Sequence, residues 1–421
     1  MSPARPSGVA VDAVVIGAGL AGLRCAERLL AEGLDVVVLE ARDRVGGRVW
    51  SHRFEDGQTC ERGAEFIDGN HTEVLALADE VGLTLTERAV GADAQATLID
   101  AGGRVVPMHL HASLAEDWPR WEAGLAALQP TDEFERASLA DLIASLGMSA
   151  ISRLVIGREI RTEFMLPPEA VSQRFAAEVA SRHQPDQRKR HRVVGGNDQL
   201  AMGLARRLGD RVRLTTPVRS IDAEAGAVAL LDGSTLQAAA VVAAVPLPVL
   251  SRLWPALPPA LGSVGYGVGG TISVQFRRRI WLDYSRNATV HSDRSWGHLW
   301  ESTDGQPGDP GVLTSRLSSY DGAGLVALPE APDRLVSEID RIFPGAKGLA
   351  GDRVVTDWTN DPYSLGTAAC FAPGHWNAAQ PELHTPHGRL WLAGEHADGY
   401  AGSMEGALRS GARVAASIRL A

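Results

Sequence analysis

The chain has 421 residues, of which 45% are hydrophobic and 22% charged, so it can bury large cores and is long enough for two domains. Its formal net charge of -10 argues against nucleic acid or an anionic membrane as a partner, because both bind clustered cations. Its 3 cysteines have no CxxC spacing, which indicates neither a disulfide framework nor a metal site and favours a reducing cytoplasm. No run reaches the ~18 apolar residues of a membrane helix, and residues 1–10 have no apolar signal core.

The first predicted unit is a strand, a glycine turn and a helix. Residues 11–16 are apolar and rich in β-branched side chains, residues 17–22 hold the turn, and apolar residues then recur at helical spacing. Gly17 permits a tight turn, Gly19 lets backbone N–H groups approach a pyrophosphate, and Gly22 lets the helix pack closely on the strand. The unit therefore predicts a dinucleotide site, and a glycine-rich turn without a ligand is the alternative.

The next apolar run, residues 35–39, ends in Glu40, whose carboxylate can accept hydrogen bonds from ribose hydroxyls. Arginines and paired glycines follow it directly, where a long pyrophosphate ligand needs positive charge and close backbone approach. They are Arg42, Arg44, Gly46, Gly47 and Arg48. This cluster favours FAD over NAD, and a solvated basic loop is the alternative.

The middle of the chain predicts a helical lobe and then sheets. Residues 76–190 are rich in helix formers, and the basic run 188–192 is interpreted as a solvated linker between domains. Residues 241–245 are typical of a fully buried strand. Alternating segments at 271–276 and 311–317 predict a mixed sheet that carries the substrate site.

The C-terminal part predicts a second ligand contact. Residues 391–395 form a buried strand that ends in Gly394-Glu395, and residues 402–407 open a last helix with a small-residue face. Backbone N–H groups at a helix N-terminus suit a ligand atom that accumulates negative charge.

Blocks along nearly the whole chain resemble the flavin-containing amine oxidases, which include monoamine oxidases, polyamine oxidases and L-amino acid oxidases. The blocks are residues 40–48, 62–68, 194–200, 216–218, 242–246, 358–366 and 392–407. The resemblance implies an α/β fold with a Rossmann-like FAD-binding domain of the glutathione-reductase type, and a discontinuous α+β substrate domain made of a mixed sheet and a helical lobe. Residues 9–75, 195–260 and 385–421 would form the first domain, and residues 76–194 and 261–384 the second.

The resemblance also implies which residues hold FAD. Besides the glycine turn, Glu40, Arg42, Gly47 and Arg48, they are Gly63, Ala64, Glu65, Val218, Gly394, Glu395, Ser403, Met404 and Ala407. Covalent relatives carry the flavin on a cysteine where this chain has Thr367, so FAD should be bound noncovalently. Their two cage tyrosines correspond to Ala368 and Ser403, and Tyr400, Phe371 and Trp358 are the candidate aromatic walls or simply core.

Candidate catalytic residues come from the same comparison. Glu65 and Asp68 lie in a block that resembles the cavity-lining segment of the family, and a carboxylate there would bind an ammonium or act as a base. The alternative is that either one caps a backbone turn. Arg316, on an alternating strand, would pair with a substrate carboxylate or carbonyl, or form a structural ion pair.

Thr271 bears on which molecule takes the electrons from the reduced flavin. Relatives usually have a lysine, bridged by water to flavin N5, at about this position, and the chain's lysines, Lys189 and Lys347, lie elsewhere in the sequence. Re-oxidation of the reduced flavin by O2 is therefore expected to be slow, and an electron carrier is the alternative acceptor.

The resemblance implies oxidation of an amine substrate to an imine by hydride transfer to flavin N5. Alternatives are an imine-forming oxidase-cyclase of secondary metabolism, a phytoene-desaturase-type flavoenzyme and a non-catalytic relative of the fold. No metal is expected, and the sequence leaves room for a homodimer.

Overall fold

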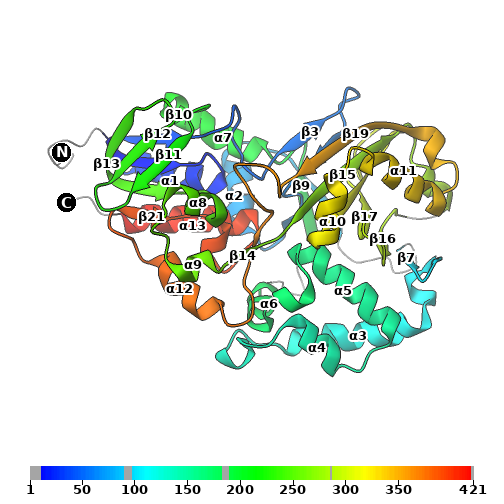
Figure 1. The fold of residues 1–421 in the computed structure, drawn as a ribbon. Helices are drawn as coiled ribbons and strands as arrows, with labels where there is room; N and C mark the ends of the chain where they lie inside the picture. The colour runs from blue at the N-terminus through cyan, green and yellow to red at the C-terminus, as the bar shows by residue number, and fades with distance from the viewer. Residues whose placement is uncertain (1–10, 90–96, 183–188, 285–286, 419–421) are drawn as a thin grey trace.

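The computed structural model describes residues 11–89, 97–182, 189–284 and 287–418. The N-terminal segment 1–10, in which no targeting signal is expected, lies outside these residues. Two sheets lie side by side, with a helical lobe below the second (Figure 1). We call them the parallel sheet and the mixed sheet.

The parallel sheet is built on β1 (Val11–Ile16), which pairs in parallel with its neighbours on both sides. The strands of the sheet are β10 (Val212–Arg213), β2 (Val36–Leu39), β1, β13 (Thr235–Ala243) and β21 (Leu390–Leu392), extended by antiparallel β12 (Ala227–Leu230) and β11 (Val218–Asp222). Its central strands are almost continuously apolar because both faces are covered. Segments from three distant parts of the sequence thus meet in one sheet.

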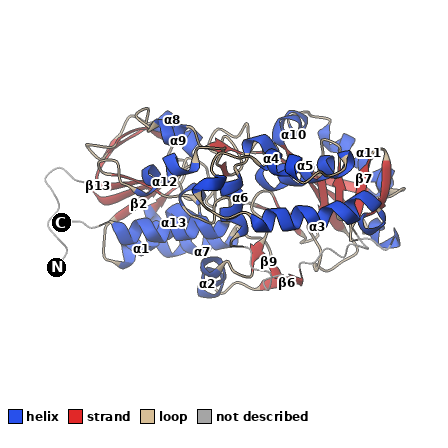
Figure 2. Cartoon of the chain, turned by 90° about the horizontal axis from the view of Figure 1, so that it is seen from below, coloured by secondary structure: helices blue, strands red, loops and turns tan. Residues whose placement is uncertain are grey.

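Helices cover both faces of the parallel sheet. On one face lie α1 (Leu20–Ala31), α2 (Thr72–Glu80), α7 (Gln199–Leu208) and α13 (Met404–Ser417), and on the other α8 (Leu247–Leu253), α9 (Pro259–Gly262) and α12 (Trp376–His384). The helices α1 and α13 run side by side (Figure 2). A Cβ at Gly411 would lie 2.2 Å from the Ala21 carbonyl oxygen, so the predicted small-residue face of the last helix does pack closely.

The mixed sheet has seven strands in the order β19 (Ala350–Asp357), β15 (Gly269–Phe276), β18 (Gly311–Ser318), β17 (His298–Glu301), β16 (Val290–Ser292), β7 (Leu98–Ala101) and β8 (Arg104–Pro107). The pair β16 and β7 is parallel and the other pairs are antiparallel, which confirms a mixed sheet. Its apolar face packs under α10 (Ser319–Val326) and α11 (Ala331–Ile342).

The helical lobe consists of α3 (Ala112–Ala127), α4 (Leu139–Ser145), α5 (Ala150–Phe164) and α6 (Gln173–Ala180). A serine side chain caps the start of α4, α5 and α6, and Ser138 and Asp141 form a complete capping box at the start of α4. The predicted helical lobe is confirmed, although its segment also supplies the strands β6 (Leu85–Ala89), β7 and β8.

The basic run was predicted to be a linker, and its described part is a strand instead. The strand β9 (Lys189–Val193) lies between β5 (Ile67–Asp68) and β6 (Leu85–Ala89). Arg190 and Arg192 on β9 form ion pairs with Asp68 and Glu65. The charges are therefore neutralised by carboxylates far away in the sequence, which a local charge pattern does not show.

Two small sheets complete the fold, one of β3 (Ser51–Arg53) and β4 (Thr59–Glu61), the other of β14 (Gly265–Tyr266) and β20 (Ala369–Cys370). Across the described residues, no helix has both the length and the apolar character needed to span a membrane. The same residues contain no group of three or more His, Cys, Asp or Glu placed to hold a metal ion.

Candidate active site

A cavity of about 470 Å³ is lined by residues from both sheets and from the helical lobe. The parallel-sheet side includes the glycine turn after β1, the end of β2, the start of β11 and the segments that follow β21. The mixed-sheet side includes β15, β18 and the end of α5. Chain segments that are distant in sequence therefore share one cavity, which we divide into a parallel-sheet end and a mixed-sheet end.

The glycine turn has the geometry that the sequence predicts. Gly17 has a φ of +101°, and a Cβ there would lie 2.7 Å from the Ala244 carbonyl oxygen. A Cβ at Gly22 would lie 2.0 Å from the Gly17 carbonyl oxygen, whereas one at Gly19 would meet nothing within 4 Å. Gly19 precedes α1 and lines the cavity. The first N–H groups of α1 are thus accessible to an anionic ligand.

Glu40 is buried at the end of β2 and lines the cavity. One carboxylate oxygen accepts the Ala18 N–H at 2.8 Å and the other accepts the Arg42 N–H at 2.9 Å. A carboxylate has lone pairs for further hydrogen bonds. Glu40 therefore fixes the glycine turn and can still accept ligand hydroxyls.

Two arginines connect the first βαβ segment to the C-terminal half of the chain. Arg48 forms an ion pair with Glu395 at 2.9 Å and donates to the Thr367 carbonyl, and Arg42 pairs with Asp361. Both line the cavity. Arg44 differs from the expectation, because its guanidinium stacks on Trp50, 4.1 Å from the ring centroid, and it is not among the lining residues. Burial lowers the pKa of Arg44 to about 10.

Glu395 organises the segment after β21. Besides pairing with Arg48, its carboxylate accepts N–H groups from Ala369 and, at 2.8 Å, from Gly402. Ser403 then caps α13 by accepting the Gly406 N–H at 3.0 Å. The other predicted cofactor residues that line the cavity are Gly47, Gly63, Ala64, Val218, Gly394, Met404 and Ala407.

Two buried polar atoms on the cavity wall test whether a ligand fits. The Thr367 hydroxyl and His396 Nε2 have no hydrogen-bond partner among the described residues. Tyr266 accepts the Leu247 N–H, and its hydroxyl lies 3.1 Å from His396 Nδ1, so the opposite ring nitrogen, Nε2, is the one that faces no protein partner among the described residues. Burial lowers the pKa of His396 to about 4, so the ring is neutral at pH 7. A ligand with hydrogen-bonding atoms, such as a flavin nucleotide, would satisfy both groups.

Three residues singled out from the sequence, Thr271, Arg316 and Trp358, line the mixed-sheet end of the cavity. Trp358 Nε1 donates to the Arg62 carbonyl at 3.0 Å, and the Thr271 hydroxyl is 3.4 Å from the same oxygen. Thr271 lies directly opposite Arg316 in the sheet. The position that lacks a lysine therefore has a cationic neighbour on the next strand, which the sequence did not reveal.

Only some of the residues that the sequence suggested as walls of the substrate site line the cavity. Ala368 and Ser403 line it, as does Trp358. Phe371 is fully buried among Phe175 and Trp376, which makes it core, and Tyr400 packs against His71 and is not a lining residue.

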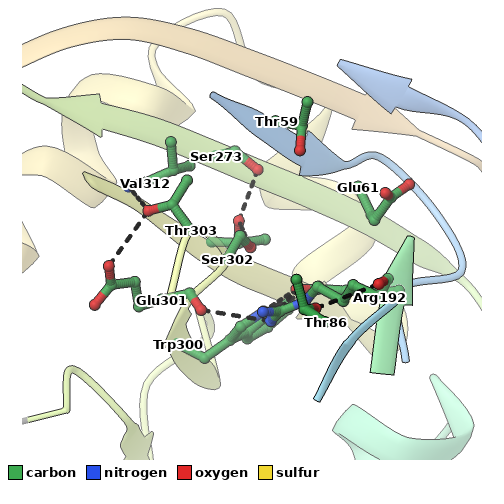
Figure 3. A network of polar contacts seen from close by, with 12 residues as sticks. Thr59, Glu61, Thr86, Arg192, Ser273, Trp300, Glu301, Ser302, Thr303 and Val312 are labelled. Carbon is green, nitrogen blue, oxygen red and sulfur yellow. Dashed lines mark hydrogen bonds and ion pairs between the residues drawn. The ribbon is translucent and has the colours of Figure 1, made fainter. Parts of the chain in front are cut away.

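Glu65 and Asp68 are not among the described residues that line the cavity. Glu65 pairs with Arg192 at 2.6 Å and accepts the Trp300 N–H. Its partners Arg192 and Trp300 belong to the polar network drawn in Figure 3. Asp68 pairs with Arg190 at 3.2 Å. The expectation was that both carboxylates line the cavity; instead β9 pairs with β5, and its arginines Arg190 and Arg192 bind Asp68 and Glu65 away from the lining residues.

Sequence reasoning missed His396, Met165 and Glu163, which all line the cavity. His396 directly follows the predicted Glu395, so proximity in sequence was a usable signal. Met165 and Glu163 lie at the end of α5 in the helical lobe, and no local pattern linked that helix to the site.

A glycine turn at a helix N-terminus, an acid at the end of β2 and a cavity extending to a second sheet are typical of dinucleotide-binding oxidoreductases. A family model described as flavin containing amine oxidoreductase matches residues 20–419. The chain belongs to this family, whose members are flavin-containing enzymes that oxidise amines with an electron acceptor.

Individual relatives share the full length of the chain. It is 28% identical to a Mycobacterium tuberculosis protein named flavin-containing monoamine oxidase AofH, over 97% of this chain and 96% of that one. It is 26% identical to nicotine dehydrogenase of Pseudomonas putida, over 97% and 88%. Putrescine oxidase bound to putrescine has the same fold, with a TM-score of 0.84 and 23% identity over 96% and 98% of the two chains.

Proposed function

We propose that this protein holds FAD noncovalently and oxidises a C–N bond of a small amine to an imine. The observation that supports it most is the single cavity, which joins the glycine turn and Glu40 to Thr271, Arg316 and Trp358 on the mixed sheet. The flavin, when bound, accepts a hydride from the carbon beside the amine nitrogen. The domain limits stated from the sequence are part of this proposal.

Dinucleotide rather than mononucleotide binding is supported by the lining near β2 and β11. Glu40, Arg42 and Val218 lie beyond the glycine turn, where an adenosine half would be held, and His396 and Ser403 lie on the segments after β21. The N-terminus of α1, which lines the cavity between these groups, would hold the pyrophosphate.

Noncovalent binding is supported by the cysteines. Cys25, Cys60 and Cys370 are free and buried, and none of them lines the cavity. Burial raises the pKa of Cys25 and Cys60 to about 12 and also raises that of Cys370. These thiols are protonated at pH 7 and so are poor nucleophiles. Free thiols also suit the cytoplasm, where we place the protein.

The chain's own residues position the substrate and exclude water. Trp358 and Thr271 both contact the Arg62 carbonyl, which fixes the wall beside Gly63. A Cβ at Gly63 would lie 3.2 Å from the Trp358 ring, so the backbone there approaches the ring closely. An amine confined by these groups would be desolvated before oxidation. Oxygen or an electron carrier then takes the electrons, and the dehydrogenase name of one relative keeps the second option open.

Acid precipitation tests the cofactor proposal. All yellow colour should pass into the supernatant and chromatograph as FAD. Flavin retained in the pellet would contradict noncovalent binding, and release of FMN would contradict the adenosine site. Incubation with an amine panel should give the matching carbonyl product after imine hydrolysis.

A further inference from the structure

The strand register places a row of polar side chains across one face of the mixed sheet. The direct partners run Thr356, Thr271, Arg316, His298 and His291 on strands β19, β15, β18, β17 and β16. Directly opposite residues project from the same face of an antiparallel sheet. The opposite face holds the apolar residues under α10 and α11. Thr271 and Arg316 line the cavity, so this polar row borders the site.

Arg316 is the cation of this row. Its guanidinium donates to the Thr162 carbonyl at 3.1 Å, in the last turn of α5, and lies 5.5 Å from the Trp300 ring centroid. Within the described part of the chain it forms no ion pair with a carboxylate. A half-buried guanidinium has five N–H donors and favours a planar anion with two oxygens.

The carboxylates around Arg316 already have other partners. Glu159 on α5 contacts His291, and Glu65 is held by Arg192 and the Trp300 N–H. Figure 3 shows how Trp300 and Arg192 lie together beside the sheet. Burial opposes ionisation of Glu159, and His291, His298 and Arg316 together lower the pKa of this carboxyl, yet among the described residues neither Glu159 nor Glu65 forms an ion pair with Arg316.

His298, which lies directly opposite Arg316 on the next strand, neither adds to the Arg316 charge nor offsets it. Burial, and then the neighbouring His291, lowers the pKa of His298 to about 3, so it is neutral at pH 7. Glu163, the cavity-lining carboxylate at the end of α5, is solvent-exposed and forms no ion pair or hydrogen bond with Arg316. Arg316 is therefore a cavity-lining cation without an ion-pair partner among the described residues.

We propose that Arg316 binds an anionic group of the substrate, so that the amines this protein oxidises best also carry a carboxylate. The inference rests on the proposed amine oxidation and names the substrate class of the same site. A substrate carboxylate would accept hydrogen bonds from the Arg316 guanidinium, while the carbon that carries the amine would lie toward Thr271 and Trp358. Neutral monoamines and diamines would leave the guanidinium without a counter-ion in a partly desolvated site.

A purely structural role is the competing explanation, because Arg316 also ties the C-terminal end of α5 to the sheet. Binding experiments separate the two. The FAD-loaded enzyme is titrated with benzoate and with its neutral isostere benzamide, and the change in flavin absorbance is followed. Benzoate should bind at least tenfold more tightly. In Arg316→Gln this preference should fall by about ten- to a hundredfold, as expected for loss of a charge-assisted bond.

Two further variants control for charge and folding. Arg161→Gln removes the same charge from α5 at a residue that bonds Gly157 and does not line the cavity, so the preference should be unchanged. Arg316→Lys keeps the charge without the planar fork and should retain part of the preference. A wild-type protein without preference for benzoate, or Arg316→Gln with an unchanged preference, would overturn the proposal even if one variant fails to fold.

Substrate pairs give the second readout. We compare kcat/KM for L-phenylalanine with phenethylamine, L-leucine with isoamylamine, and L-ornithine with putrescine. In the wild type, the carboxylated member of each pair should have the higher kcat/KM, mainly because its KM is lower. In Arg316→Gln this advantage should disappear. If the decarboxylated amines win, the inference is wrong while amine oxidation stands. If no amine is oxidised although benzoate is preferred, the proposed function fails instead.

Discussion

At the parallel-sheet end of the cavity the turn after β1 is shaped by glycines, whereas at the mixed-sheet end several exchangeable side chains line the wall. Gly17 and Gly22 leave no room for a Cβ, with carbonyl oxygens 2.7 and 2.0 Å from where it would lie. The other end is defined by Thr271, Arg316 and other side chains that a sheet strand can exchange freely. A shape made by backbone constrains the residue type strictly, so the parallel-sheet end should tolerate little change and the mixed-sheet end should change selectivity without loss of fold.

The largest effect is expected at the glycine turn. In Gly22→Ala the methyl group would overlap the Gly17 carbonyl, at a cost at or above the ~1–3 kcal/mol typical of overpacking. In Gly19→Ala the backbone is extended and nothing lies within 4 Å, so the folded apoprotein should lose only ~1 kcal/mol or less. Its methyl group would nevertheless enter the cavity and weaken FAD binding by at least about tenfold. Thermal unfolding of the apoproteins and FAD titration measure both effects.

Gly324→Ala is the matched control, because Gly324 lies in α10 with open space around it. It should be neutral or stabilising by up to ~1 kcal/mol and leave FAD affinity unchanged. Equal stability of the Gly22→Ala and Gly19→Ala apoproteins would contradict the claim that close backbone approach fixes the residue type in the glycine turn.

The backbone-defined end could be predicted from sequence for the same reason. Only glycine fits at Gly17 and Gly22, and Glu40 must follow β2, so residue types at fixed spacing identify the turn. Two strands of the mixed sheet, β15 and β18, were also predictable from their local pattern, whereas β7 and β8 lie in the segment predicted to be helical. The role of β9 was not, because Arg190 and Arg192 are neutralised by Asp68 and Glu65 more than a hundred residues earlier. Side-chain pairs of this kind depend on topology that a local pattern does not contain.

Removing the Glu40 carboxylate should have the next largest effect. Glu40→Ala loses a ribose contact and the two N–H groups of Ala18 and Arg42 that the carboxylate fixes. We expect FAD affinity to fall by ~1.5–3 kcal/mol, while the flavin-loaded fraction retains its turnover. Equilibrium FAD titration beside single-turnover reduction checks this. An unchanged FAD affinity would place Glu40 away from the cofactor.

At the mixed-sheet end, Thr271→Lys should raise the rate at which oxygen re-oxidises the reduced flavin, since a positive charge favours electron transfer to dioxygen. The wild type should react slowly, and Thr271→Met serves as a neutral control of similar length. Stopped-flow mixing of dithionite-reduced enzyme with oxygenated buffer needs no substrate. A fast wild-type rate would contradict the expectation and would indicate that Arg316, directly opposite, already supplies the charge.

The smallest effect concerns the stability that the pair of His291 and Glu159 contributes to the mixed sheet. Burial alone would lower the pKa of His291, but Glu159 outweighs it and raises that pKa above 6.5. Burial likewise opposes ionisation of Glu159, yet His291 brings its pKa below 4.5. Because its pKa is raised, His291 stabilises the folded state below pH 6.5, and this contribution is lost as pH rises. Because its pKa is lowered, Glu159 stabilises the folded state above pH 4.5, and this contribution is lost as pH falls.

The pair should therefore contribute most between these two values. The free energy lost in His291→Asn should be larger near pH 5.5 than near pH 8.5 by ~1 kcal/mol, as measured by urea unfolding. His384→Asn, at an exposed residue of α12, should show no such difference. A pH-independent loss in His291→Asn would show that the pair is not ionised.

Anaerobic mixing of the FAD-loaded protein with amines tests the central claim most directly. One cavity that holds the flavin and the amine together predicts that at least one amine bleaches the flavin absorbance in a single turnover, without any added acceptor. A protein that binds FAD but keeps its oxidised spectrum with every amine and amino acid would contradict this account of the site.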